Sequence, residues 1–252
     1  MKWSIPMKDE SASDEGVPGS SKRDAQARIP PVEPDLIGAW SKHGVYLFGL
    51  RTPFSLVFLS WATAASALSA EFQWNRYLLG LVAAFFGLVV GAHYIDIAGS
   101  KGKYRPFFPE MNVRRVMLIG VAAALVGAGV GVYIAVAYNP LFLIFVALAS
   151  FSAIFYPLEK PKLLHTYVGF GLAWGFLPTL GAYYLQSSKI DLLSLGFAAF
   201  VGITVVQMHH MATLSNEKEN PPAVTRNARY LLKLHRAAAF SLGLLLLLSK
   251  LV

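Results

Sequence analysis

Seven apolar stretches divide this chain, and the connections between them are alternately basic and nearly uncharged. The stretches are Phe54–Leu68, Tyr77–Ile95, Val116–Tyr138, Leu141–Tyr156, Leu163–Leu185, Leu192–His209 and Ala237–Leu248. Lys and Arg gather before the first stretch and in the second, fourth and sixth connections, whereas the other connections hold only Arg76 and Lys189. Helices that cross a bilayer with their basic loops on one side produce this pattern. The sequence therefore predicts an all-α, multi-pass membrane helix bundle with about seven transmembrane helices.

The longest uncharged run supports this prediction. From Val116 to Leu158 the chain has no charged side chain and is interrupted once, at Tyr138-Asn139-Pro140. At roughly 1.5 Å per helical residue, the run is long enough to cross a hydrocarbon core of about 30 Å twice. A soluble protein can bury one helix of this kind but rarely seven.

The net charge of +8 would suit a polyanionic partner, but its placement argues against nucleic acid. Cytoplasmic loops carry the excess of Lys and Arg, so the N-terminus is expected in the cytoplasm. With seven spans, the C-terminus is then expected outside. Part of the charge is expected to face anionic lipid or an anionic substrate. The chain has no cysteine, which excludes disulfides, thiolate nucleophiles and cysteine-ligated metals.

The N-terminal region differs in composition from the rest of the chain. Residues 1–36 are rich in Ser, Asp, Glu, Lys and Pro and contain no apolar core of the length that a signal peptide needs. This composition predicts a disordered cytoplasmic tail. The transmembrane helical domain is expected over residues 37–252.

Asp96 is the leading candidate for a functional residue. It directly follows an uncharged helix, and ionisable groups at membrane depth are costly and usually functional. His93 lies three residues earlier on the same helix face, with Tyr94 between them. A carboxylate and an imidazole on one face can hold Mg²⁺ or move a proton. The alternative is a helix-end aspartate exposed among lipid headgroups.

Three connections on the predicted cytoplasmic side carry the remaining candidates. Because Lys and Arg donate charge-assisted hydrogen bonds to phosphate oxygens, their basic residues suit a phosphorylated ligand, and lipid headgroups are the alternative partner. The candidates in these connections, basic or not, are Lys101, Lys103 and Arg105 after the second helix, Tyr156, Lys160 and Lys162 after the fourth, and His209, His210, Glu217 and Lys218 after the sixth. A bundle can close these connections over a common mouth.

At these residues the chain resembles the UbiA-type intramembrane prenyltransferases. Arg51-Thr52-Pro53-Phe54 is similar to the start of that family's first helix. The segment Phe155–Lys162, followed by Gly169-Phe170-Gly171 and Gly181–Tyr184, is similar to its region of helices four and five. The likeness covers most of the chain from Arg51 onward.

The resemblance implies a Mg²⁺-dependent site for a prenyl diphosphate. The family has nine helices, with aspartate-rich motifs after the second and the sixth. Of the first motif this chain keeps Tyr94 and Asp96, and at the second it has Thr213 and Glu217. Asp96 and Glu217 would then be the metal ligands, and Lys101, Lys103, Lys162 and Lys218 would bind phosphate. His93 or Tyr94 would orient the donor.

Three functions follow as hypotheses. The first is a prenyltransferase that moves an isoprenoid group from a prenyl diphosphate to a lipophilic acceptor. The second is a non-catalytic protein of the same fold that binds an isoprenoid lipid or supports a partner enzyme, which the reduced motifs favour. The third is a small transporter that uses its His and Asp groups as proton carriers. The first is preferred because of the resemblance.

Overall fold

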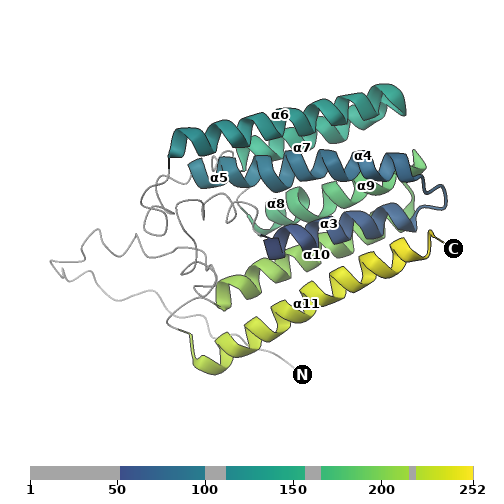
Figure 1. Cartoon of the computed structure of the whole chain (residues 1–252). Coiled ribbons are helices and arrows are strands. Elements are labelled where there is room, and N and C mark those ends of the chain that lie inside the picture. The colour runs from purple at the N-terminus through teal and green to yellow at the C-terminus, as the bar shows by residue number, and fades with distance from the viewer. Residues whose placement is uncertain (1–51, 100–111, 157–165, 216–219, 252) are drawn as a thin grey trace, which may run out of the picture.

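The computed structural model describes residues 52–99, 112–156, 166–215 and 220–251, and within these ranges the chain is helical with no strand (Figure 1). The elements are α3 (Thr52–Leu68), α4 (Trp74–Ala84), η2 (Phe85–Ala92), α5 (His93–Gly99), α6 (Val113–Ala137), η3 (Pro140–Phe142), α7 (Leu143–Phe155), α8 (Tyr167–Gly171), η5 (Leu172–Phe176), α9 (Leu177–Ser187), α10 (Leu192–Leu214) and α11 (Pro222–Leu248). This confirms the predicted all-α fold class.

Several of these elements join end to end into longer rods. The segments α4, η2 and α5 follow one another without a break, with η2 a π-helical stretch, and α8, η5 and α9 do the same. Four helices are long and apolar enough to cross a membrane, namely Trp74–Gly99, Val113–Ala137, Leu192–Leu214 and Pro222–Leu248. Two shorter apolar helices cover Phe54–Leu68 and Pro140–Phe155. The described residues therefore form a membrane-type helical bundle.

Successive rods run in alternating directions (Figure 1). The C-terminal ends of α5, α7 and α10 lie at one end of the bundle, together with the starts of α3, α6, α8 and α11. We call this the Asp96 end. The turns from α3 to α4, from α6 to η3 and from α9 to α10 lie at the other end, which we call the Gln186 end. Helix α3 packs against both α11 and α9, and α6 packs against η2, α4 and α5.

Close backbone contacts between glycines hold neighbouring rods together. A Cβ atom added to Gly127 in α6 would lie 2.6 Å from the Cα of Gly87 in η2. A Cβ on Gly175 in η5 would lie 2.6 Å from the Cα of Gly202 in α10. Small residues that let helix backbones approach are the usual means of packing in a bilayer, where lipid tails are as apolar as the side chains. These glycines therefore serve helix packing.

The outward faces of the helices are apolar. Leu125 in α6 is 68% exposed and Leu192 at the start of α10 is 88% exposed. Exposed apolar surface on this scale is typical of a protein that faces lipid. The buried interior contains polar side chains as well, of which His93 and Gln186 are the largest that are almost fully enclosed.

The last helix is longer than the sequence indicates. Hydropathy places its start at Ala237, whereas α11 begins at Pro222 and contains Arg226, Arg229 and Lys233. The physical reason is that Pro is favoured in the first turn and that Arg, Lys, Ala and Leu all form helices well. Hydropathy detects where a helix becomes apolar, which is a different boundary from where it begins.

Candidate functional site

His93 is buried at the Asp96 end and held by two kinds of contact. It is 2% exposed, and its Nδ1 donates a hydrogen bond to the carbonyl oxygen of Val89 at 2.8 Å, since a carbonyl can only accept. The imidazole stacks on the ring of Trp174 with the centroids 5.3 Å apart and the planes within 9°. The edge of Phe54 meets it from α3 at 5.7 Å. These contacts fix the ring between α5, η5 and α3.

Tyr94 and Asp96 follow His93 on the same helix. Tyr94 is buried towards α6, where a Cβ on Gly120 would lie 3.0 Å from the Cβ of Tyr94. Asp96 is half-buried, in the last turns of the rod that ends at Gly99. The structure therefore places all three predicted residues of this helix at one end of the bundle, with Asp96 the most accessible of them.

Aromatic contacts join predicted site residues from three separate connections. Tyr156, directly after α7, lies 6.1 Å from the Trp174 ring that stacks on His93, and 5.9 Å from Phe170. Phe170 in turn contacts His209 of α10 at 4.5 Å. The structure thus brings His93, Tyr156 and His209 into one aromatic cluster. His210 lies beside it, exposed, with its ring 6.2 Å from Tyr167.

Trp174 is the member of this cluster that sequence reasoning missed. It is buried, and its Nε1–H has no hydrogen-bond partner among the residues that the structure describes. A single Trp in an apolar run is ordinarily a core residue, so its sequence offers no signal that sets it apart. Only its position between the rings of His93 and Tyr156 gives it a role in the site.

The remaining predicted site residues lie outside the described residues. They are Lys101, Lys103, Arg105, Lys160, Lys162, Glu217 and Lys218. Their proposed roles stay predictions. Of the predicted metal pair, only Asp96 is described, and the described part of the chain holds no group of three or more His, Asp or Glu side chains that could share a metal ion. The Mg²⁺ site therefore stays a prediction as well.

An apolar cavity of about 460 Å³ runs between the rods. Its walls come mainly from α3, α4, η2, α6, α7 and α9, with single residues from α5, η3 and η5. Among its lining residues only Ser66, Tyr77 and Ser150 carry a hydroxyl group. At one end it reaches Ile95, which directly precedes Asp96. At the other it reaches Leu185, next to Gln186. The apolar interior suits the hydrocarbon part of a ligand, and Asp96 is the neighbour in sequence of a lining residue but is not itself one.

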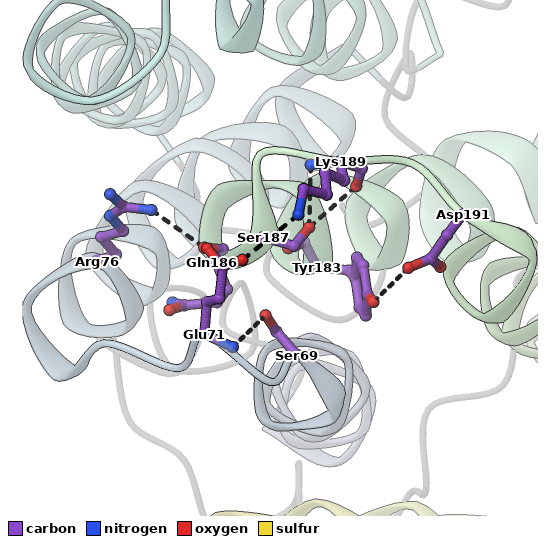
Figure 2. Close-up of polar contacts among 8 residues, drawn as sticks. All are labelled: Ser69, Glu71, Arg76, Tyr183, Gln186, Ser187, Lys189 and Asp191. Atoms are coloured by element: carbon purple, nitrogen blue, oxygen red, sulfur yellow. Dashed lines mark hydrogen bonds and ion pairs between the residues drawn. The ribbon is translucent and has the colours of Figure 1, made fainter.

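A polar network closes the Gln186 end of the bundle (Figure 2). Gln186 is fully buried; its side-chain Oε1 accepts a hydrogen bond from the backbone N–H of Gln73 at 2.7 Å. Its backbone carbonyl accepts one from Nη1 of Arg76 at 3.0 Å. The Arg76 guanidinium also lies 5.0 Å from the ring centre of Tyr138 after α6. The ends of α9 and α6 are thereby tied to the turn before α4.

Two further contacts extend this network. Lys189 forms an exposed ion pair with Glu71 at 3.6 Å, and the ammonium of Lys250 donates to the carbonyl of Ser69 at 3.2 Å. Asp191 caps α10, and the hydrogen bond from the Ser194 backbone N–H, followed by that from the Tyr183 hydroxyl, lowers the pKa of its carboxyl. These groups were not predicted as a site, and their contacts are those of a structural closure.

Comparison with protein-family models, with curated proteins and with solved structures gives no match for this chain. The resemblance to the UbiA-type prenyltransferases therefore rests on the residues quoted above, and the argument for function rests on the cavity and the residues around it.

Proposed function

We propose that this chain is a multi-pass membrane protein of the UbiA type that binds a prenyl diphosphate and transfers its isoprenoid group to a lipophilic acceptor. The observation that carries the proposal is the apolar cavity that reaches Ile95, directly before Asp96. Its volume of about 460 Å³ lies within the range of about 300–1,000 Å³ that is usual for small-molecule sites.

The two parts of the donor match two parts of the molecule. The hydrocarbon tail would lie in the cavity, whose walls offer apolar contact along most of their length. The diphosphate would lie at the Asp96 end, beside the aromatic cluster. Residues of the connections at that end, which lie outside the described ranges, would neutralise its charge; they are Lys101, Lys103, Lys162 and Lys218.

The transfer itself is a substitution at the first carbon of the prenyl group. The bond between that carbon and the diphosphate oxygen breaks, and the diphosphate leaves with the bonding electrons. A new bond forms between the same carbon and the acceptor, which loses a proton. A divalent cation held by Asp96 and Glu217 would neutralise the charge on the leaving group. Because His93 is enclosed on Trp174, its part is to position the helix that carries Asp96.

Turnover by the purified full-length protein in lipid tests this proposal. With a prenyl diphosphate, Mg²⁺ and a panel of lipophilic acceptors, we expect inorganic diphosphate and a heavier lipid product. Asp96→Asn is expected to abolish both. Asp191→Asn, the same substitution at the other end of the bundle, is the control and is expected to retain turnover. Full activity of the Asp96→Asn protein would remove the proposed site.

A second candidate function is binding without transfer. Two observations favour it. Among the described residues no three His, Asp or Glu side chains lie together as metal ligands, and His93 is enclosed. In that case an isoprenoid lipid would co-purify with the protein and raise its melting temperature, with no product and little dependence on Mg²⁺. Release of diphosphate would exclude this candidate.

We also propose how the chain is oriented in the membrane. All seven rods would span the membrane, with the Asp96 end in the cytoplasm, because the connections at that end carry most of the Lys and Arg. The N-terminus would then be cytoplasmic and the C-terminus external.

A further inference from the structure

The cavity extends along much of the bundle. On the rod Trp74–Gly99 its lining residues run from Tyr77 to Ile95, a distance of about 27 Å at roughly 1.5 Å per residue. On the opposite wall they run from Phe142 to Ile154, about 18 Å by the same measure. A cavity of this length and of modest volume is elongated, as a single hydrocarbon chain is.

At the Gln186 end the lining includes the large side chains of Tyr77, Leu185 and Phe142. Leu185, 5% exposed, fills the space that Gly80 leaves open, since a Cβ on Gly80 would lie 2.8 Å from Cδ2 of Leu185. Tyr77 stands beside it, with its hydroxyl 3.0 Å from Oγ1 of Thr63. Tyr77 also borders a second apolar groove between α3, α4 and α11, so its ring separates the two spaces.

The polar network behind these side chains resists displacement. Arg76 donates to the carbonyl oxygens of Leu185 and Gln186, at 3.5 Å and 3.0 Å. A hydrocarbon that moved the end of α9 would separate the Arg76 guanidinium from these two carbonyl oxygens. Hydrogen bonds from a charged donor stabilise more than those from a neutral one, so their loss is unfavourable. These hydrogen bonds therefore oppose displacement of the end of α9.

The interior offers little to a polar ligand. Of the lining hydroxyl groups, that of Ser66 donates to the carbonyl of Ala182 at 3.3 Å, and that of Tyr77 pairs with Thr63. Both are used within the protein. The part of the ligand that enters the cavity is therefore expected to be hydrocarbon throughout, with polar groups confined to the Asp96 end.

We infer that the cavity limits the length of the isoprenoid chain that the protein binds. Tyr77 and Leu185 stop a chain that enters from the Asp96 end, so prenyl groups longer than the cavity bind poorly. This inference rests on the proposed function and adds to it a limit on chain length. In lipid the prenyl tail is already in an apolar medium. The preference for one chain length therefore comes from how well the tail fills the cavity, and not from its removal from water.

A series of prenyl diphosphates, each one isoprene unit longer than the last, tests the limit. Binding to the full-length protein in lipid nanodiscs, measured by competition against one labelled member, is expected to pass through an optimum. Beyond it, binding is expected to weaken roughly 5- to 150-fold, the factor that corresponds to overpacking by about 1–3 kcal/mol.

Two matched variants of α7 place the limit in this cavity. Ala149 lines the cavity, so Ala149→Phe is expected to move the optimum to a shorter chain. Ala147 faces outward on the same helix, and Ala147→Phe is expected to leave the optimum unchanged. A melting temperature near that of the wild type shows that each variant is folded.

The outcomes separate this inference from the proposed function. Equal binding of all chain lengths by the wild type would overturn the limit and leave the function standing. An optimum that Ala149→Phe does not move would overturn the assignment to this cavity. Failure of the folded wild type to bind any member of the series would overturn both. An optimum that shortens in Ala149→Phe alone supports the inference.

Discussion

Adding one methyl group at Gly127 tests whether close backbone contact holds the bundle together. A Cβ there would lie 2.6 Å from the Cα of Gly87 and 2.9 Å from the carbonyl oxygen of Ala83. Both neighbours are backbone atoms, which cannot rotate away, so α6 and η2 must separate. Overpacking of this kind costs about 1–3 kcal/mol.

Gly129 provides the matched control, because a Cβ on it would meet no atom within 4 Å. Gly→Ala in a helix also stabilises by up to about 1 kcal/mol, and both variants share this gain. The difference between Gly127→Ala and Gly129→Ala therefore isolates the clash. We expect Gly127→Ala to be the less stable of the two by about 1–3 kcal/mol.

A third glycine of the same helix is expected to fall between them. A Cβ on Gly131 would lie 2.7 Å from a methyl group of Val146, which is side chain and can shift further than backbone. Reversible unfolding in mixed detergent micelles, followed by circular dichroism, gives the three free energies. If Gly127→Ala and Gly129→Ala agree within about 0.5 kcal/mol, the spread of ordinary surface substitutions, the close contact does not stabilise the bundle.

Two further predictions concern topology and pH. The chain has no cysteine, so in a single-cysteine variant any labelling comes from the introduced residue. A membrane-impermeant maleimide is expected to label Lys189→Cys on intact cells but Arg114→Cys only after permeabilisation. Labelling of both variants on intact cells would contradict the proposed orientation. The lowered pKa of Asp191 means that its ionised form stabilises the fold above the ordinary Asp value of 3.8, and that this contribution is lost as the pH falls through the lower folded value. The melting temperature of the wild type is therefore expected to fall more steeply in acid than that of Asp191→Asn, and parallel curves would show that the carboxylate contributes nothing.

Helix positions were the most predictable feature of this protein. Among the described residues, apolar length alone located most of the helical rods closely, because an apolar helix long enough to cross a membrane stands out from its polar connections. The start of the last helix was misplaced at Ala237, because α11 continues through a charged segment to Pro222. The break at Tyr138-Asn139-Pro140 was read correctly as a turn, and the structure places it between α6 and η3.

The candidate site was predictable in part. Asp96, His93 and Tyr94 stood out because polar groups at the end of an apolar helix are rare, and the structure places them at the end of the bundle that also holds Tyr156 and His209. Trp174 was not predictable as the residue that joins them, since an aromatic residue in an apolar run looks the same whether it fills a core or supports a site. The phosphate-binding and metal-binding roles stay predictions.

The sequence by itself indicated a helical bundle that faces lipid. The reason is that apolar stretches and charged connections alternate along the chain, and this alternation is visible without any knowledge of tertiary contacts. The cavity, which is lined from Tyr77 and Leu185 to Ile95, and the enclosure of His93 were decided only by the tertiary structure. They depend on which small residues of one helix face which residues of another, as Gly80 faces Leu185. That pairing is set by the packing of distant segments, which no local pattern encodes.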